Sequence, residues 1–363
     1  MVSQPQAGAD VIRLARPDVD ESELAEIAAV LESGQLTMGP KVEELEGLLA
    51  RAAGAEHAVA VSSGTAALHL AVLATGIGPG DEVLVPAYTF PSTANVVALV
   101  GARPVLVDVD PVTMNMDPED AARRVTPDTK AILAVHLFGR PARLEELPDL
   151  PLLEDAAGAL GASHRGRPCG GLGLLGCFSF HPRKIVTTGE GGAVTTNDAE
   201  LAERVRSLRH HGWSPSHGYE DMPEGAYNYR LSDVLCALGI PQLRRLDELL
   251  AARERVAAGY AERLGGLDVV LPEADSGDRH GWQAYVIQLD RRDAVMEGLR
   301  AQGIQCQIGT YALHRLGAYR AQGPFPGADA AFERALALPL HSRLTDAELD
   351  RVAEVLDKLV SHH

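Results

Sequence analysis

The sequence has few cysteines, and their arrangement indicates neither a bridge nor a metal site. The four residues Cys169, Cys177, Cys236 and Cys306 form no C-x-x-C pair. Zinc sites and disulfide frameworks need closely spaced or regularly paired cysteines. We therefore expect free thiols, no metal site and a reducing compartment.

Positive charge and long apolar stretches are also scarce. The chain has 33 Lys and Arg against 50 Asp and Glu, for a net charge of −17 at pH 7. Such a chain cannot neutralise many phosphates, so we expect no nucleic-acid partner, although local donors can still hold a small anion. No apolar run reaches membrane-spanning length, and the N-terminus lacks the apolar core of a signal peptide. We expect a soluble, cytoplasmic protein without a membrane partner.

Short apolar segments alternate with helical ones through most of the chain. Continuous apolar runs typical of strands buried on both faces occur at 58–61, 82–86, 104–109 and 131–137. The alternation predicts an α/β fold with a mainly parallel sheet flanked by helices.

The pattern changes along the C-terminal third of the 363-residue chain. Residues 235–260 are expected to form one long helix bent at Pro241, and from about Leu246 the alternation loosens. This predicts an N-terminal arm at 1–17, a large domain at 18–245 and a smaller C-terminal α+β domain at 246–363.

Chemically useful side chains follow several of the predicted strands. Thr65, Phe90, Asp155, Ser179 and Lys184 each lie just after a strand-like run. Ligands of parallel α/β sheets bind beyond the carboxyl ends of the strands. We expect these five residues to lie near one another.

Each local pattern also has an ordinary structural interpretation. Lys184 follows a strand and precedes a glycine cluster, which suits a Schiff-base lysine, but Arg183–Lys184 is equally compatible with a solvated surface pair. The turn Ser62–Thr65 suits an anion site or a plain helix N-cap. Asp155 is either a buried carboxylate that needs a cation or the N-cap of a helix over 156–160.

Five ordered motifs together give a more specific picture. They are SSGTAAL at 62–68, VPAYTFPSTAN at 85–95, EDAAGALGA at 154–162, SFHPRKIVTTGEGG at 179–192 and YNYRLSD at 227–233. Over nearly its whole length the chain resembles the DegT/StrS family of pyridoxal-phosphate (PLP) aminotransferases, best known as sugar aminotransferases. The resemblance implies PLP fold type I, as in aspartate aminotransferase, with a large PLP-binding domain.

The resemblance also implies roles for the motif residues. Lys184 would form the Schiff base with PLP and later carry the proton between the substrate carbon and C4′ of the cofactor. Asp155 would pair with the pyridinium nitrogen and make the ring an electron sink. The other cofactor contacts would come from Phe90 on the ring and from Gly64, Thr65 and Ser179 on the phosphate.

Further residues are implied for the partner subunit and the substrate. Asn228 matches a residue that reaches the phosphate in the neighbouring subunit, which implies a homodimer with shared active sites. Arg183, Arg230 and His314 are candidate substrate contacts. Gly158 departs from the family pattern, because many members have Gln or His three residues after the aspartate, near the ring hydroxyl. We assign that role to no residue.

The implied reaction has two halves. L-Glutamate, or alternatively glutamine, would convert PLP to pyridoxamine phosphate, which would then aminate a keto sugar on a nucleotide diphosphate. A dTDP-linked 4-keto-6-deoxyhexose is the favoured substrate, for natural-product or surface-glycan biosynthesis. The alternatives are a 3-keto sugar, a cyclitol ketone, or a PLP-binding regulator without turnover. Dehydratase relatives carry His in place of Lys184, so the lysine favours amino transfer.

Overall fold

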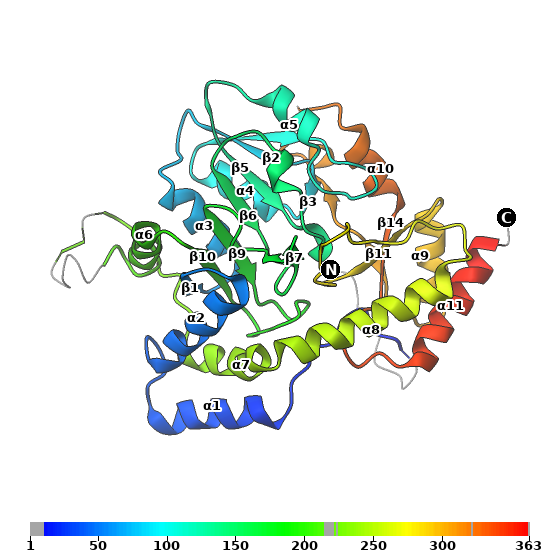
Figure 1. Ribbon diagram of the computed structural model, residues 1–363, viewed down its shortest axis with the longest axis horizontal. Coiled ribbons are helices and arrows are strands. Elements are labelled where there is room, and N and C mark those ends of the chain that lie inside the picture. Colours follow the sequence, from blue (N-terminus) through cyan, green and yellow to red (C-terminus); the bar gives the residue numbers. More distant parts are fainter. Residues whose placement is uncertain (1–10, 214–220, 223, 321, 362–363) are drawn as a thin grey trace.

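A seven-stranded sheet forms the centre of the protein (Figure 1). The computed structural model describes residues 11–213, 221–222, 224–320 and 322–361. The strand order is β1 (His57–Val61), β10 (Gly192–Thr196), β9 (Leu175–Ser179), β6 (Leu152–Asp155), β5 (Thr129–Val135), β2 (Glu82–Pro86) and β4 (Arg103–Val107). Of these strands β10 alone is antiparallel to its neighbours, so the predicted mainly parallel sheet is confirmed.

Helices cover both faces of this sheet, because its strands are apolar on both sides. One face packs against α3 (Gly64–Ala74), α4 (Ser92–Leu99) and α6 (Ala199–Arg209). The other face packs against α2 (Pro40–Ala53), α5 (Pro118–Arg124) and α7 (Asp233–Arg244). The N-terminal helix α1 (Glu21–Ser33) lies along α7, and a capping box of Asp20 and Glu23 fixes its first turn.

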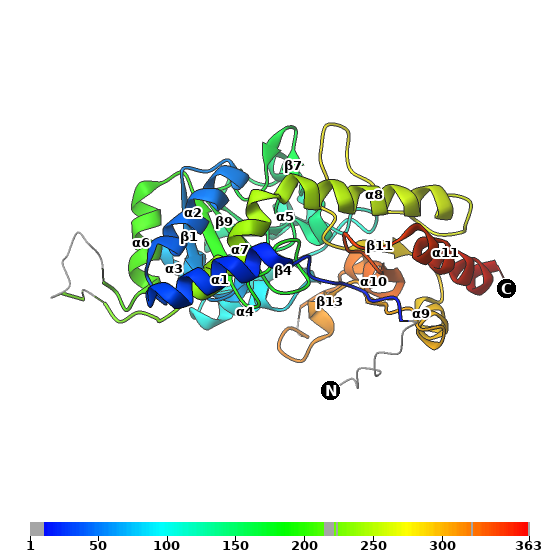
Figure 2. The ribbon, with the colours of Figure 1, turned by 90° about the horizontal axis from the view of Figure 1, so that it is seen from below.

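A second, antiparallel sheet lies nearer the C-terminus. It consists of β11 (Tyr285–Gln288), β14 (Ala335–Leu338) and β12 (Gln307–Ile308). Its core is shared with α8 (Leu246–Leu264), α9 (Arg292–Ala301) and α11 (Asp346–Ser361). Figures 1 and 2 both show α8 extending from α7 to α11. The domain boundary at 245/246 stays a prediction.

The predicted single helix over 235–260 is wrong. The chain forms α7 and α8 with a break at Arg245, whose φ of −107° and ψ of 25° are not helical. Pro241 lies inside α7 and lacks the N–H that a continuous helix would use. The guanidinium of Arg245 is fixed at the start of α1 by an ion pair to Glu23 at 2.7 Å.

Two further expectations concern cysteines and membrane segments. All four cysteines are free and buried. Within the described residues, no helix is both long and apolar enough to span a membrane.

Candidate active site

The carboxyl ends of β1, β9 and β6 meet at one edge of the large sheet. Asp155 ends β6, Ser179 ends β9, and Gly64 starts α3 just after β1. Lys184 lies in the loop that joins β9 to β10. The fold therefore places the predicted lysine, carboxylate and anion-binding turn at the same edge.

The loop that carries Lys184 is held at both of its ends. The N–H of Phe180 donates to the carbonyl of Gly191 at 2.8 Å, and the Lys184 N–H donates to His181 at 2.8 Å. The buried amide of Gln242 in α7 both accepts from and donates to the backbone of Thr187. These bonds fix the loop without involving the lysine side chain.

The amine of Lys184 is available for chemistry. Its Nζ makes no hydrogen bond or ion pair with any described residue. Burial lowers the pKa of Lys184 below its usual range, and the negative charge of Asp155 opposes this shift. A lysine with a lowered pKa has a larger unprotonated fraction, which a nucleophilic amine requires.

Asp155 is a buried carboxylate with few partners. It is 4% exposed. Its Oδ2 accepts from the Thr93 hydroxyl at 2.9 Å, and its Oδ1 accepts from the N–H of Ala157 at 3.2 Å. Burial raises the pKa of Asp155, and the hydrogen bond from Thr93 opposes this shift. The carboxylate therefore suits a cationic ligand.

The alternative role of Asp155 as a helix cap is not realised. Residues 156–160 form turns and no helix, although Asp155 does accept one N–H from the first turn. Sequence reasoning missed Thr93, which is completely buried in the first turn of α4 and also contacts the hydroxyl of Thr89 at 3.2 Å. Its position within the motif at 85–95 was the available signal.

The turn before α3 packs closely against the end of β9. A Cβ built on Gly64 would lie 2.7 Å from the Cβ of Ser179, so only glycine fits here. Ser63 caps the helix by accepting from the N–H of Ala66 at 3.0 Å. The N–H groups of Gly64 and Thr65 have no partner within the described chain. Free N–H groups beside two hydroxyls suit a phosphate.

Phe90 lies next to a segment from the C-terminal part of the chain. The two-residue strand β3 (Tyr88–Thr89) pairs with β13 (Tyr311–Ala312), and the rings of Phe90 and Tyr311 lie 6.2 Å apart. The Phe90 ring is 59% exposed. It is therefore open to stack on a flat ligand.

The candidate substrate residues are less closely grouped. Arg183 donates to Gln307 of β12 at 2.5 Å. Arg230 donates to the ring of His210 at 2.7 Å and pairs with Val61 at the end of β1. Burial, followed by the charge of Arg230, lowers the pKa of His210.

His314 and Asn228 lie outside this group. The His314 ring is bound to Asp329 of α10 (Pro326–Arg334) at 2.9 Å and packs against Phe325. Asn228 is exposed and pairs through its backbone with His210. The structure therefore joins neither side chain to Lys184.

These features fit PLP. Among the described residues the buried Asp155 has no cationic partner at hydrogen-bond distance, and a protonated ring nitrogen would supply one. The close packing of Gly64 on Ser179 brings the free N–H groups at the start of α3 near the end of β9, and these N–H groups together with the hydroxyls of Thr65 and Ser179 would hold the phosphate. Lys184 would supply the amine.

The comparison with protein families decides the class. Residues 17–357 match the DegT/DnrJ/EryC1/StrS aminotransferase family. The chain belongs to this family. It is an aminotransferase, and the family works with PLP.

Named relatives cover almost the whole chain. GDP-perosamine synthase of Caulobacter vibrioides is 40% identical over 96% of this chain and 98% of its own. The putative sugar aminotransferase Spr1654 of Streptococcus pneumoniae, solved in its pyridoxamine-phosphate (PMP) form, is 30% identical, with a TM-score of 0.92 over 97% of this chain and 98% of that chain. DesI, solved in the presence of its TDP-sugar product, is 35% identical, with a TM-score of 0.91 over 99% of this chain and 95% of that chain.

Proposed function

We propose that this aminotransferase moves the amino group of L-glutamate to a 4-keto-6-deoxyhexose linked to a nucleotide diphosphate. Three features at one sheet edge support this: a lysine amine without a partner among the described residues, a buried carboxylate, and a helix-start turn that suits an anion. The 40% identity to a GDP-perosamine synthase and the fold shared with DesI support a nucleotide sugar as acceptor. The names of these two relatives mention GDP and TDP respectively, so sugars linked to dTDP and to GDP are both to be tested.

The residues of the chain divide the chemistry between them. When bound, PLP supplies a carbonyl for amine exchange and an electron sink for the carbanion. Lys184, with its lowered pKa, would move the proton between the substrate carbon and C4′ of the cofactor. Asp155 would keep the ring nitrogen protonated, and Thr93 holds the carboxylate in place. Phe90 would cover one face of the ring and exclude water there.

A substrate panel tests the proposal. The purified enzyme with glutamate is given dTDP- and GDP-linked 4-keto-6-deoxyhexoses, a 3-keto sugar nucleotide and a free cyclitol ketone. We expect 2-oxoglutarate and a 4-amino sugar, identified by product NMR, from one of the first two substrates. Amination of the cyclitol alone would refute the nucleotide-sugar proposal. If glutamate fails to convert the visible band of bound PLP to the ultraviolet band of PMP, a regulator without turnover is favoured.

We also propose that two copies of the chain share each active site. The exposed Asn228 and the exposed ring of Phe90 are available to a second subunit. Asn228 would then reach the phosphate bound at Gly64 of the partner.

The free thiols further support a cytoplasmic location.

Subunit mixing tests the shared site. Lys184→Ala and Asn228→Ala subunits, each inactive alone, are mixed in equal amounts, and exchange is verified by native mass spectrometry. If Asn228 acts across the interface, each mixed dimer has one intact site, and about a quarter of wild-type activity returns. If Asn228 acts within its own subunit, no mixed dimer has an intact site and no activity returns.

A further inference from the structure

A glutamine from a distant part of the chain occupies the space beside Gly158. A Cβ built on Gly158 would lie 3.4 Å from both Cγ and Oε1 of Gln283. Gly158 is not among the residues with a positive φ, so its backbone would accept a side chain. A Cβ at position 158 would thus make an ordinary contact with Gln283, and it is a longer side chain there that would compete with Gln283 for the same space.

The backbone of Gln283 is fixed from two sides. Its N–H donates to the carbonyl of Phe138 at 3.1 Å. The guanidinium of Arg253 in α8, only 4% exposed, donates to the carbonyls of Trp282 at 2.9 Å and Gln283 at 3.3 Å. Burial lowers the pKa of Arg253 to about 10. The guanidinium is bound by these two carbonyl oxygens where a buried arginine usually has a carboxylate partner. A buried guanidinium that binds only two backbone carbonyls, among the described residues, holds this segment in a fixed position.

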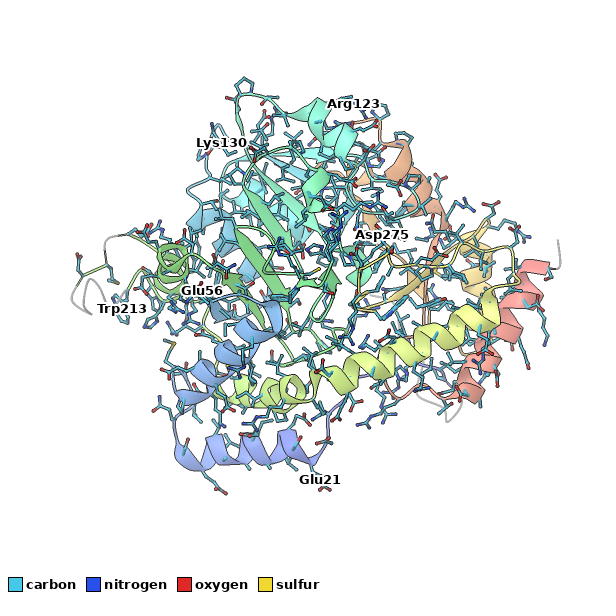
Figure 3. All side chains as sticks on the ribbon, viewed as in Figure 1. Glu21, Glu56, Arg123, Lys130, Trp213 and Asp275 are labelled. Atoms are coloured by element: carbon cyan, nitrogen blue, oxygen red, sulfur yellow. The ribbon has the colours of Figure 1, made fainter. Side chains whose placement is uncertain are left out.

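Close packing and ion pairs fix the neighbouring segment as well. A Cβ on Gly139, at a φ of +96°, would lie 2.9 Å from the N of Trp282, so a glycine permits this approach. Asp275, labelled in Figure 3, accepts from Arg140 at 2.6 Å and from Arg143 at 2.8 Å. The segment before Gln283 is thus tied to the chain that follows β5.

The amide of Gln283 lies between Gly158 and the lysine loop. Its Nε2 donates to the carbonyl of Arg183, the residue before Lys184, at 3.4 Å. Its Oε1 has no partner within the described part of the chain, and the side chain is partly exposed. An amide rotated about its last bond can offer either its N–H or its oxygen to a ligand.

The strand order places Gln283 on a definite side of the cofactor site. The phosphate turn packs against Ser179 at the end of β9, and Asp155 ends the adjacent strand β6. Phe138, which holds Gln283, follows β5 on the other side of β6. In PLP the carbon that bears the aldehyde is flanked by the phosphate arm on one side and by the O3′ hydroxyl on the other. With its phosphate at the turn before α3, bound PLP would therefore turn its O3′ side toward Gln283.

We propose that Gln283 donates a hydrogen bond to O3′ of PLP and so replaces the side chain that position 158 lacks. The inference rests on PLP binding and is independent of which sugar is aminated. A donor at O3′ stabilises the deprotonated oxygen, because hydrogen bonds favour the charged form of an acid. The proton held between O3′ and the nitrogen of Lys184 is then lost at a lower pH.

The test measures the pH titration midpoint of the visible band of PLP bound to Lys184. In Gln283→Met, which has a similar shape and no donor, we expect the midpoint to rise by about 0.5 to 1 pH unit, the effect of one neutral hydrogen bond. Gln283→Ala should do the same and weaken PLP binding by about 3- to 10-fold. Gln307→Ala, which changes the glutamine bound to Arg183, is the matched control and should leave the midpoint unchanged.

A transplant of the side chain makes the test specific. In Gln283→Ala the space beside position 158 is free, and adding Gly158→Gln should return the midpoint to the wild-type value. An unchanged midpoint in folded, PLP-loaded Gln283→Met, or no recovery in the double variant, overturns the inference. A change confined to the KM of the sugar would instead make Gln283 a substrate contact. If the wild-type protein itself takes up no PLP, the proposed function fails.

Discussion

Two adjacent buried carboxylates should respond oppositely to neutralisation. Asp155 accepts two hydrogen bonds. Glu154 accepts from the His136 ring at 2.8 Å and from three backbone N–H groups, those of Gly170, Leu172 and Gly173. Burial raises the pKa of Asp155. Burial opposes ionisation of Glu154 as well, but its hydrogen bonds prevail and lower its pKa.

The magnitude for Asp155 follows from its partners. Burying a carboxylate costs about 5 to 7 kcal/mol after relaxation. Two hydrogen bonds to a charged acceptor return about 2 kcal/mol each, which leaves a net cost of about 1 to 3 kcal/mol. Asp155→Asn removes the charge; its amide oxygen still accepts from the N–H of Ala157, and the Thr93 hydroxyl can turn to accept from the new amide N–H while it donates to Thr89. The PLP-free protein should therefore gain about 1 to 3 kcal/mol of stability at pH 8. Its Tm should rise by about 1 to 4 °C.

The raised pKa of Asp155 also predicts how the stability gain of Asp155→Asn changes with pH. The folded pKa of Asp155 is raised, so its favourable contribution is complete below the ordinary Asp pKa and is lost as pH rises through the folded pKa. The gain of Asp155→Asn should therefore grow with pH and vanish in acid. Glu154→Gln is the matched control. The folded pKa of Glu154 is lowered, so its contribution is present above the ordinary Glu pKa and is lost in acid.

Thermal unfolding of the PLP-free variants between pH 4 and 9 is the assay. Glu154→Gln should lower the free energy of unfolding by about 2 to 4 kcal/mol at pH 8, because one of the buried N–H groups that now bind the carboxylate would face the N–H of the new amide. With PLP bound, the advantage of Asp155→Asn should disappear, and its kcat should fall by about 10²- to 10³-fold. A PLP-free Asp155→Asn that is less stable than wild type at pH 8 would refute the reasoning.

Three further variants probe the same site. Gly64→Ala should weaken PLP binding at least about 10-fold, measured by fluorescence titration, because its Cβ meets Ser179, and an additional Ser179→Gly should restore binding only in part, because it relieves the clash but also removes a hydroxyl from the phosphate site. Thr93→Val should cost about 2 kcal/mol of stability at pH 8 in urea unfolding, since the adjacent carboxylate loses a donor, whereas Thr93→Ser should cost about 1 kcal/mol or less. Arg253→Lys should shift the visible-band midpoint in the same direction as Gln283→Met but less, and an unshifted midpoint would mean that the guanidinium does not position Gln283.

Local sequence patterns predicted the elements that depend on neighbouring residues. The strand that ends at Asp155, the turn before α3 and the loop of Lys184 are each readable from short apolar runs followed by small or polar residues. The parallel-sheet rule then placed these residues at one edge. The mainly parallel sheet is confirmed.

Contacts between distant segments could not be predicted in this way. Thr93 contacts Asp155 across two strands of the sheet, and Gln283 reaches Gly158 from a segment with no motif of its own. Arg245, at the break between α7 and α8, forms an ion pair with Glu23 of α1, more than 200 residues earlier in the chain. Such pairings depend on tertiary packing, which a single sequence does not display.

The position of β10 has a consequence for synthesis on the ribosome. Within the large sheet β1 pairs with β10 only, although it is made long before that strand. The apolar run that ends at Val61 must therefore stay unpaired until Gly192 and the residues after it have left the exit tunnel. During that interval a chaperone or a premature contact can compete for its free edge. We therefore expect translation speed between these two strands to influence how much of the newly made protein reaches the native fold.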